Sequence, residues 1–185
     1  MSIKEITSCS DRIKYLLENY SSLREDDKKL WISYLIMFHN LQDVLTNSNS
    51  FEELCKLLLN KEVTNAETIR RIRQKLQQSG LYKREEKVGK KKDKKTFNTK
   101  NRVEHLLLNY PALRDCDIQL WLGYLVMFHG MKDRLNESSD PYEEFCDIVL
   151  DKDVPAIETI RRSRQLFQQS GLYLGDRKKD TVLED

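Results

Sequence analysis

The sequence contains few of the residues that interrupt regular secondary structure. Only 6 glycines and 3 prolines occur in 185 residues, while 39% of the residues are hydrophobic and 34% are charged. Sandwiches and barrels need many turns rich in glycine and proline, and disordered chains are poor in hydrophobic residues. The composition therefore predicts compact helical units and an all-α fold.

Long apolar runs are missing as well. No stretch approaches the roughly 18 apolar residues that a membrane span requires. The opening residues MSIKEITSCS have neither the basic start nor the apolar centre of a signal peptide. We therefore expect a soluble, cytoplasmic protein without a membrane partner.

The residue patterns of common metal and catalytic sites are also lacking. The 4 cysteines and 3 histidines form no CxxC and no HxxxH pair. The stretch GKKKD at 89–93 lacks the earlier glycine and the later hydroxyl residue of a phosphate-binding P-loop. Adjacent glutamates, at 52–53 and again at 143–144, face different directions on a helix and do not form a catalytic pair. We expect no metal, no cofactor and no enzymatic activity.

The cysteines and histidines have a simpler structural interpretation. Cys55 and Cys146 stand at matching positions in amphipathic segments, so we interpret them as reduced core thiols. His39 and His129 each follow a phenylalanine at matching positions, and we interpret them as packed side chains.

Internal repetition is the most prominent feature that the sequence does have. LWISYLIMFH at 30–39 returns as LWLGYLVMFH at 120–129, and ETIRRIRQKLQQSGLY at 67–82 returns as ETIRRSRQLFQQSGLY at 158–173. The offset changes from 90 to 91 residues at one insertion among Asn, Ser and Thr, where a loop is expected. We predict two tandem homologous helical domains joined by a basic flexible linker, with these bounds: repeat 1, residues 1–83; linker, 84–100; repeat 2, 101–175; polar tail, 176–185.

Charge is distributed unevenly over these parts. The formal net charge of +2 divides into +1 for residues 1–82, +6 for 83–100 and −5 for 101–185. The excess positive charge therefore lies in the linker, while repeat 2 is acidic.

Apolar spacing predicts four helices in each repeat. In repeat 1 they comprise a first helix capped by Ser10 or Asp11, a long second helix at about 26–45, a third at about 51–59 and a fourth that ends near Ser79 with Gly80 as its C-cap. Thr64 and Glu67 fit a capping box at the start of the fourth helix. Repeat 2 has Pro155 in place of Thr64, so we expect proline in its first turn and a start that differs by a residue or so.

The fourth helix carries a polar face that both repeats retain. Ile69, Ile72 and Leu76 share the face expected to point to the core. Arginine and glutamine, rather than the usual lysine and glutamate, occupy the opposite face, and both side chains can bond a base edge in two places. A solvated face with salt bridges from Glu67 to Arg70 or Arg71 is the alternative.

The segment from Phe51 to Tyr82 resembles the helix-turn-helix of bacterial and phage DNA-binding proteins. Thr68, Ile69 and Arg71 match the opening T-I/V-x-R pattern of its second helix, and Leu76, Gly80 and Leu81 match the closing pattern. In repeat 2 the matching residues are Thr159, Ile160, Arg162, Phe167, Gly171 and Leu172. The segment from YPALRD to FHG, residues 110–130, lies ahead of the motif in repeat 2 and is similar to small phage-encoded helix-turn-helix proteins. Arg73 and Arg164 stand where that family has an apolar residue, so the helix is rotated or its edge is exposed.

The resemblance implies double-stranded DNA as the partner and a regulatory role in a bacterial or phage-infected cell. The fourth helix of each repeat would lie in a major groove, and the linker would allow both to bind at once. Tyr82 and Tyr173 would either pack back on the helix or touch a phosphate. The residues expected to contact DNA are Thr64, Asn65, Arg70, Arg71, Arg73, Gln74, Lys75, Gln78, Arg161, Arg162, Arg164, Gln165, Gln169, Lys91 and Lys92.

Two other functions fit the same sequence. The acidic repeat 2 favours a tandem protein-interaction module, such as a phage inhibitor of a host nucleic-acid enzyme. Alternatively, the repeats divide the work, with repeat 1 on DNA and repeat 2 on a protein.

Overall fold

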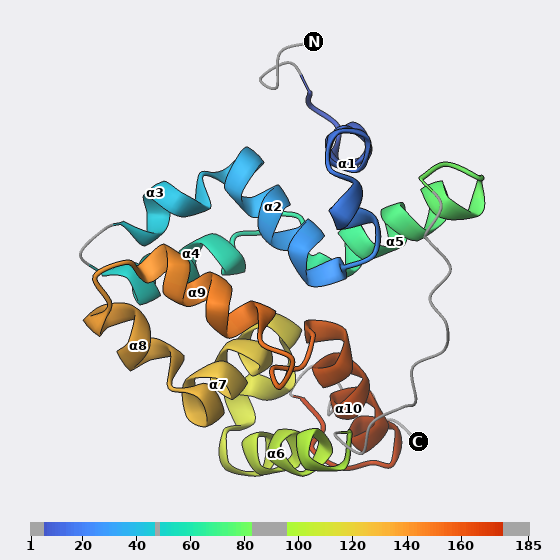
Figure 1. Ribbon diagram of the computed structural model, residues 1–185. Coiled ribbons are helices and arrows are strands. Elements are labelled where there is room, and N and C mark those ends of the chain that lie inside the picture. Colours follow the sequence, from blue (N-terminus) through green and yellow to red (C-terminus); the bar gives the residue numbers. More distant parts are fainter. Residues whose placement is uncertain (1–5, 47–48, 83–95, 176–185) are drawn as a thin grey trace. The chain divides into compact units, whose positions relative to one another are not determined.

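The computed structural model describes residues 6–46, 49–82 and 96–175, and these residues are helical with no β-strand among them (Figure 1). The predicted all-α fold is confirmed. The helices of repeat 1 are α1 (Cys9–Asn19), α2 (Asp27–His39), α3 (Leu41–Leu45), α4 (Ser50–Leu59) and α5 (Ala66–Gln78). Those of repeat 2 are α6 (Thr96–Asn109), α7 (Asp117–His129), α8 (Met131–Glu137), α9 (Pro141–Leu150) and α10 (Ile157–Gln169), and each repeat adds a 3-10 turn, η2 (Ser21–Arg24) or η3 (Pro111–Arg114).

The long second helix expected at 26–45 is instead two helices. Asn40 adopts a left-handed conformation with φ 50° between α2 and α3, and Gly130 does the same with φ 62° between α7 and α8. A left-handed residue ends an α-helix because its backbone turns away from the helix axis, and Asn and Gly are the residues that tolerate it best. The expectation of one continuous helix was wrong in both repeats.

The helix starts also differ from the expected caps. Ser8, rather than Ser10 or Asp11, caps α1 by accepting a hydrogen bond from the Asp11 N–H at 3.1 Å. Asn65, rather than Thr64, caps α5 by accepting from the Thr68 N–H at 2.8 Å. The capping box of Thr64 with Glu67 is therefore not formed.

The counterpart of α5 in repeat 2 begins without a side-chain cap. Ala156 precedes α10 and forms no such bond, and Pro155 lies before the helix rather than in its first turn. At the offset of 91 residues, Ala66 and Ile157 are equivalent, so α5 and α10 start at the same place. The expected shift of the helix start was wrong.

The C-terminal end of α5 is as expected. Gly80 has φ 86°, its N–H bonds the Gln77 carbonyl at 3.1 Å, and the Leu81 N–H bonds the Leu76 carbonyl at 3.0 Å. This pair of bonds is a Schellman motif, which requires a left-handed residue after the helix. Gly171 closes α10 with the same geometry.

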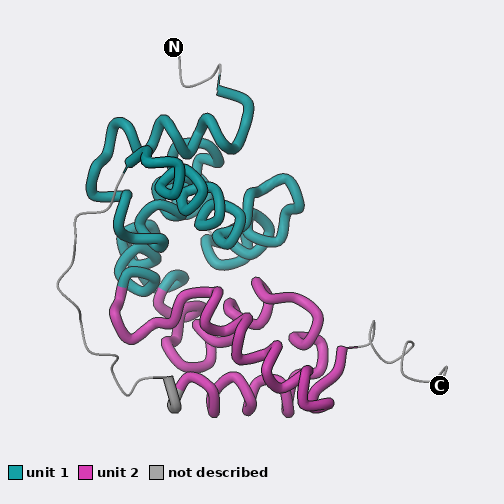
Figure 2. The backbone as a smooth tube through the Cα atoms, turned by 90° about the vertical axis from the view of Figure 1, so that its right-hand side faces the viewer, with its two compact units in different colours: residues 1–91, 135–150 teal, residues 92–134, 151–185 magenta. Residues whose placement is uncertain are grey.

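The helices gather in two compact units, each with its own buried residues (Figure 2). In unit 1, α5 packs mainly against α2 and α1, while the main partner of α4 is α3. In unit 2, α10 packs against α6 and α7. The two helices of the segment that resembles a helix-turn-helix, α4 and α5, thus make their main contacts with other helices.

The compact units do not coincide with the sequence repeats. Unit 1 contains α1 to α5 together with α9, and the boundary falls inside α8, after Arg134. Helix α9 belongs to repeat 2 in sequence, yet it packs on α2 and α3 of unit 1. Helix α6 begins at Thr96, so residues 96–100 of the predicted linker are helical.

Candidate nucleic-acid interface

Helix α5 is rotated relative to the orientation that its apolar residues predicted. Ile69 and Arg73 are its buried residues, whereas Ile72 and Leu76 are only half-buried. Because the buried face is centred between Ile69 and Arg73, the opposite, solvent-facing side passes through Arg71. Of the two alternatives raised by an arginine at position 73, the structure shows rotation of the helix.

Arg73 lies inside unit 1 and is not available to DNA. Its side chain is 0% exposed, Nη1 donates to the Arg24 carbonyl at the end of η2, and Nη2 lies 2.6 Å from Asp27 Oδ1 at the start of α2. A buried guanidinium needs such partners because an unpaired buried charge is strongly unfavourable. The prediction that Arg73 contacts DNA was wrong, because the side chain connects α5 to η2 and α2.

Arg164 has the same position in unit 2. Its side chain is 13% exposed, it donates to the Arg114 carbonyl of η3, and its Nη2 lies 2.8 Å from Asp117 Oδ1. The prediction of a DNA contact was wrong here for the same reason.

Gln77 and Gln168 complete this arrangement, and sequence reasoning missed both. Gln77 Nε2 donates to the Arg24 carbonyl at 2.9 Å and to the Tyr82 carbonyl at 3.2 Å. Gln168 Nε2 makes the matching bonds to Arg114 and Tyr173 at 3.0 and 3.3 Å. The available signal was the spacing, since each glutamine lies four residues after the buried arginine and so shares its helical face.

Tyr82 and Tyr173 pack back on their own units. Both have positive φ, 52° and 53°, which is unusual for a bulky residue. The guanidinium of Arg24 lies over the Tyr82 ring, 5.5 Å from its centroid, and the Tyr82 hydroxyl donates to Glu18 Oε1. Burial, followed by the hydrogen bond to Glu18, raises the pKa of Tyr82 to about 12. Much of the repeated stretch RxRQxxQQSGLY is therefore explained by contacts within each unit.

Glu67 forms ion pairs with the first two arginines of α5. Arg70 donates two hydrogen bonds to its carboxylate, from Nε and Nη2, each 2.7 Å long. Arg71 donates one more, from Nε, at 2.8 Å. The hydrogen bond from Arg70 is the largest cause that lowers the pKa of Glu67 to about 2. The salt bridges considered as the alternative for this face are therefore present.

The same cluster recurs on α10. Glu158 accepts two hydrogen bonds from Arg161, at 2.6 and 2.7 Å, and one from Arg162 at 2.7 Å. The two arginines of each cluster differ in exposure: Arg70 and Arg161 are 22% and 23% exposed, whereas Arg71 and Arg162 are both 65% exposed.

The remaining predicted contacts vary in their access to solvent. Thr64 is half-buried, with its hydroxyl 3.1 Å from that of Tyr34, and Asn65 is exposed but caps α5. Gln74 and Gln165 are half-buried. Lys91 and Lys92 lie outside the described residues.

A stripe of exposed side chains runs along α5, and the equivalent positions on α10 are exposed except for Thr159, which is half-buried. On α5 it consists of Thr68, Arg71, Lys75 and Gln78, which we call the α5 stripe. These residues are spaced by three and four, so they share one face of the helix. The equivalent α10 stripe consists of Thr159, Arg162, Leu166 and Gln169, in which Leu166 is 57% exposed. The α5 stripe is wholly polar and carries two cations, whereas an apolar side chain interrupts the α10 stripe.

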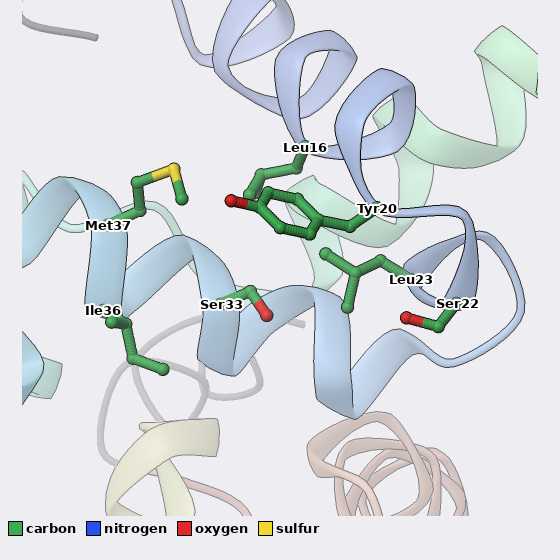
Figure 3. A pocket seen from close by; sticks show the side chains of 7 residues that line it. All are labelled: Leu16, Tyr20, Ser22, Leu23, Ser33, Ile36 and Met37. Carbon is green, nitrogen blue, oxygen red and sulfur yellow. The ribbon is translucent and has the colours of Figure 1, made fainter.

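A shallow apolar cavity lies elsewhere in unit 1. It has a volume of about 300 Å³ and lies where α1 ends, beside η2 and α2. In Figure 3, Leu16, Tyr20 and Leu23 point toward one another at its centre. None of its lining residues is among the predicted DNA contacts, and Tyr20, one of these lining residues, is 44% exposed.

The cysteine and histidine side chains are partly buried. Burial raises the pKa of the Cys55 and Cys146 thiols and lowers the pKa of His39 and His129. Within the residues that the structure describes, no group of three or more potential metal ligands occurs. Among the helices of the same residues, none combines the length and apolarity of a membrane span.

Comparisons with protein-family models, with curated proteins and with solved structures gave no match to this chain.

Proposed function

We propose that the protein binds double-stranded DNA through the α5 stripe and acts as a regulator in a bacterial or phage-infected cell. The observation that carries this proposal is the stripe itself: four exposed polar residues on one face of a helix, two of them cationic, with no acidic residue among them. A helix of this polarity fits the major groove, where arginine and glutamine can read base edges and where arginine and lysine can also neutralise phosphates.

The set of proposed contacts is smaller than the sequence suggested. In repeat 1 it comprises Arg71, Lys75 and Gln78, with Asn65 and Gln74 at the margins of the stripe. Lys91 and Lys92 of the linker would add contacts that depend on charge rather than on sequence. In repeat 2 Arg162 and Gln169 would contribute less, because Leu166 separates them and the repeat is acidic overall.

Fluorescence anisotropy with a labelled duplex, measured over a range of salt concentrations, tests the proposal. Replacing both Arg71 and Lys75 by Gln should weaken binding and reduce the slope of log affinity against log salt by roughly 2, since two phosphate contacts are lost. Lys29→Gln with Lys56→Gln removes the same charge from α2 and α4 and serves as the matched control. Equal losses in the two double variants would refute a specific role for α5.

The linker needs its own control because lysines alone bind DNA. Lys91→Gln with Lys92→Gln should lower affinity for every duplex to a similar extent. Only the α5 variant should lower discrimination between a preferred duplex and a random one. Discrimination that survives loss of Arg71 and Lys75 would show that another surface reads the sequence.

One observation favours a second candidate function, in which α10 binds a protein. Leu166 replaces Lys75 at the centre of the exposed stripe, and an exposed leucine flanked by polar residues is better suited to a protein surface than to a DNA groove. In this second proposal the ligand is a host nucleic-acid enzyme that the protein inhibits. Capture from a nuclease-treated host lysate tests this function: a protein retained by the native chain and lost with Leu166→Lys supports it, and unchanged retention opposes it.

A further inference from the structure

We propose that Glu67 is a built-in competitor for DNA phosphate: its carboxylate, bonded to both Arg70 and Arg71, accepts from Arg71 the hydrogen bond that a phosphate oxygen accepts when Arg71 turns to DNA. This inference rests on the proposed function and concerns how strongly the α5 stripe can bind.

The two arginines bind the carboxylate of Glu67 differently, so we call Arg70 the holder and Arg71 the exchangeable partner. Arg70 binds Glu67 through two parallel hydrogen bonds and is 22% exposed. Arg71 binds through Nε and is 65% exposed. A bidentate pair keeps its geometry better than a single bond. Arg71 can therefore leave the carboxylate while Arg70 continues to neutralise it.

Exchange is feasible because Arg71 is 65% exposed, although Glu67 is only 17% exposed, and an ion pair that is open to water on one side is weak. When Arg71 swings from Glu67 to a phosphate, one charge-assisted hydrogen bond replaces another, and the carboxylate keeps its two bonds to Arg70. The free energy gained from the Arg71–phosphate contact is therefore reduced by the free energy of the Arg71–Glu67 ion pair that is lost. The carboxylate also stays close to the incoming phosphate and repels it.

The cluster is built in the same way on α10, which makes it a repeated feature and not a chance pairing. Arg161 holds Glu158 through two hydrogen bonds, and the more exposed Arg162 adds one. Each helix thus carries one arginine that is held in place and one that can exchange, three or four residues after the glutamate.

Removing the carboxylate should therefore strengthen DNA binding. Glu67→Gln should raise affinity by up to about fivefold, the range expected when an exposed ion-pair partner is released. It should also steepen the salt dependence, because Arg71 then contacts phosphate without competition. Glu62→Gln is the control, since it removes an exposed carboxylate from the same repeat without touching either arginine.

A double variant identifies the arginine that exchanges. In the Arg71→Gln background, Glu67→Gln should give no more gain than Glu62→Gln. In a short-duplex titration followed by NMR, the Nε–H resonance of Arg71 should shift more than that of Arg70. Circular dichroism of each variant shows whether α5 remains folded.

The outcomes separate the two proposals. Salt-sensitive DNA binding that Arg71→Gln weakens, but that Glu67→Gln raises no more than Glu62→Gln, would overturn the competitor and leave the proposed function standing. Absence of salt-sensitive DNA binding in the native chain and in Glu67→Gln would overturn both. A gain confined to Glu67→Gln that disappears with Arg71→Gln would support both.

Discussion

Arg71 and Arg73 stand two positions apart on α5, and their surroundings give them different roles. The first projects into solvent beside Glu67, while the second is enclosed between η2 and α2. Residue type alone did not distinguish them, because both are arginines in a run rich in arginine and glutamine. The rotation of the helix, set by which residues pack against α1 and α2, decides which of the two can meet a ligand.

The enclosed arginine should contribute strongly to stability. Arg73→Met keeps much of the side-chain volume but leaves Asp27 and the Arg24 carbonyl without this partner, and we expect a loss of about 3 kcal/mol in the free energy of unfolding. Lys75→Met on the exposed face should change it by less than about 0.5 kcal/mol. Urea unfolding followed by circular dichroism measures both, and similar midpoints for the two variants would contradict the role given to Arg73.

Titration of Glu67 tests whether its carboxylate is paired with Arg70 and Arg71 on α5. Its pKa of about 2 lies below the ordinary value of 4.5, so the carboxylate stays charged in the folded protein at pH values where it would be protonated in the unfolded chain. The stability that this contributes is present above pH 4.5 and is lost as the pH falls through about 2. The carboxyl ¹³C resonance of Glu67 should report this midpoint.

Variants of Arg70 and Arg71 show which of the two arginines lowers the pKa of Glu67 more. Arg70→Gln should raise the pKa of Glu67 more than Arg71→Gln does, because the hydrogen bond from Arg70 is the largest cause of the shift. Equal effects of the two variants would mean that Arg70 does not hold the carboxylate more firmly than Arg71, which would weaken the distinction between holder and exchangeable partner.

At the scale of the helices, α2 is divided from α3, and α7 from α8, by a residue in the left-handed conformation. Replacing such a residue by one that disfavours this conformation should lower the free energy of unfolding. At Gly130 a Cβ would approach nothing closer than the Arg134 side chain at 4.0 Å, so the penalty of Gly130→Ala is conformational rather than steric. We expect a loss of about 1 kcal/mol in unfolding free energy. Asn40→Gly should be neutral or slightly stabilising, as glycine adopts this conformation freely. An unchanged midpoint for Gly130→Ala would contradict the assigned break.

Some helix boundaries could be predicted from the sequence because particular residues permit few alternatives. Gly80 marked the end of α5 correctly, since glycine after a helical pattern favours a left-handed cap. The break after His39 was missed because asparagine is only mildly unfavourable inside a helix. Comparing Asn40 with Gly130 would have provided the signal, as both belong to the small group of residues that accept positive φ.

The candidate interface was predictable only in part, for a physical reason. Polarity identifies the residues that can bond DNA, but it does not show which of them are already bonded within the protein. Arg73 and Gln77 both donate hydrogen bonds to the backbone carbonyl of Arg24, about fifty positions earlier in the chain. Such distant partners leave no local pattern in the sequence.

At the scale of the whole molecule, the sequence repeats and the compact units differ in the placement of α9. Phe145 on α9 is fully buried, and α9 packs on α2 and α3. Phe145→Ala should cost about 3 to 5 kcal/mol. Hydrogen exchange should show faster exchange of the α2 and α3 amides, although the substitution lies in repeat 2. Faster exchange confined to α6, α7 and α10 would show that α9 stabilises its own repeat instead.

We propose that the α5 stripe binds DNA and that the α10 stripe, with a leucine at its centre, binds DNA less strongly. Exchanging the two central residues tests it most directly, by salt-dependent anisotropy with each single variant and with the double variant. We expect Lys75→Leu to weaken binding, Leu166→Lys to strengthen it, and the salt slope to fall and rise by roughly 1 respectively. Unchanged affinity and slope in both single variants would contradict the claim.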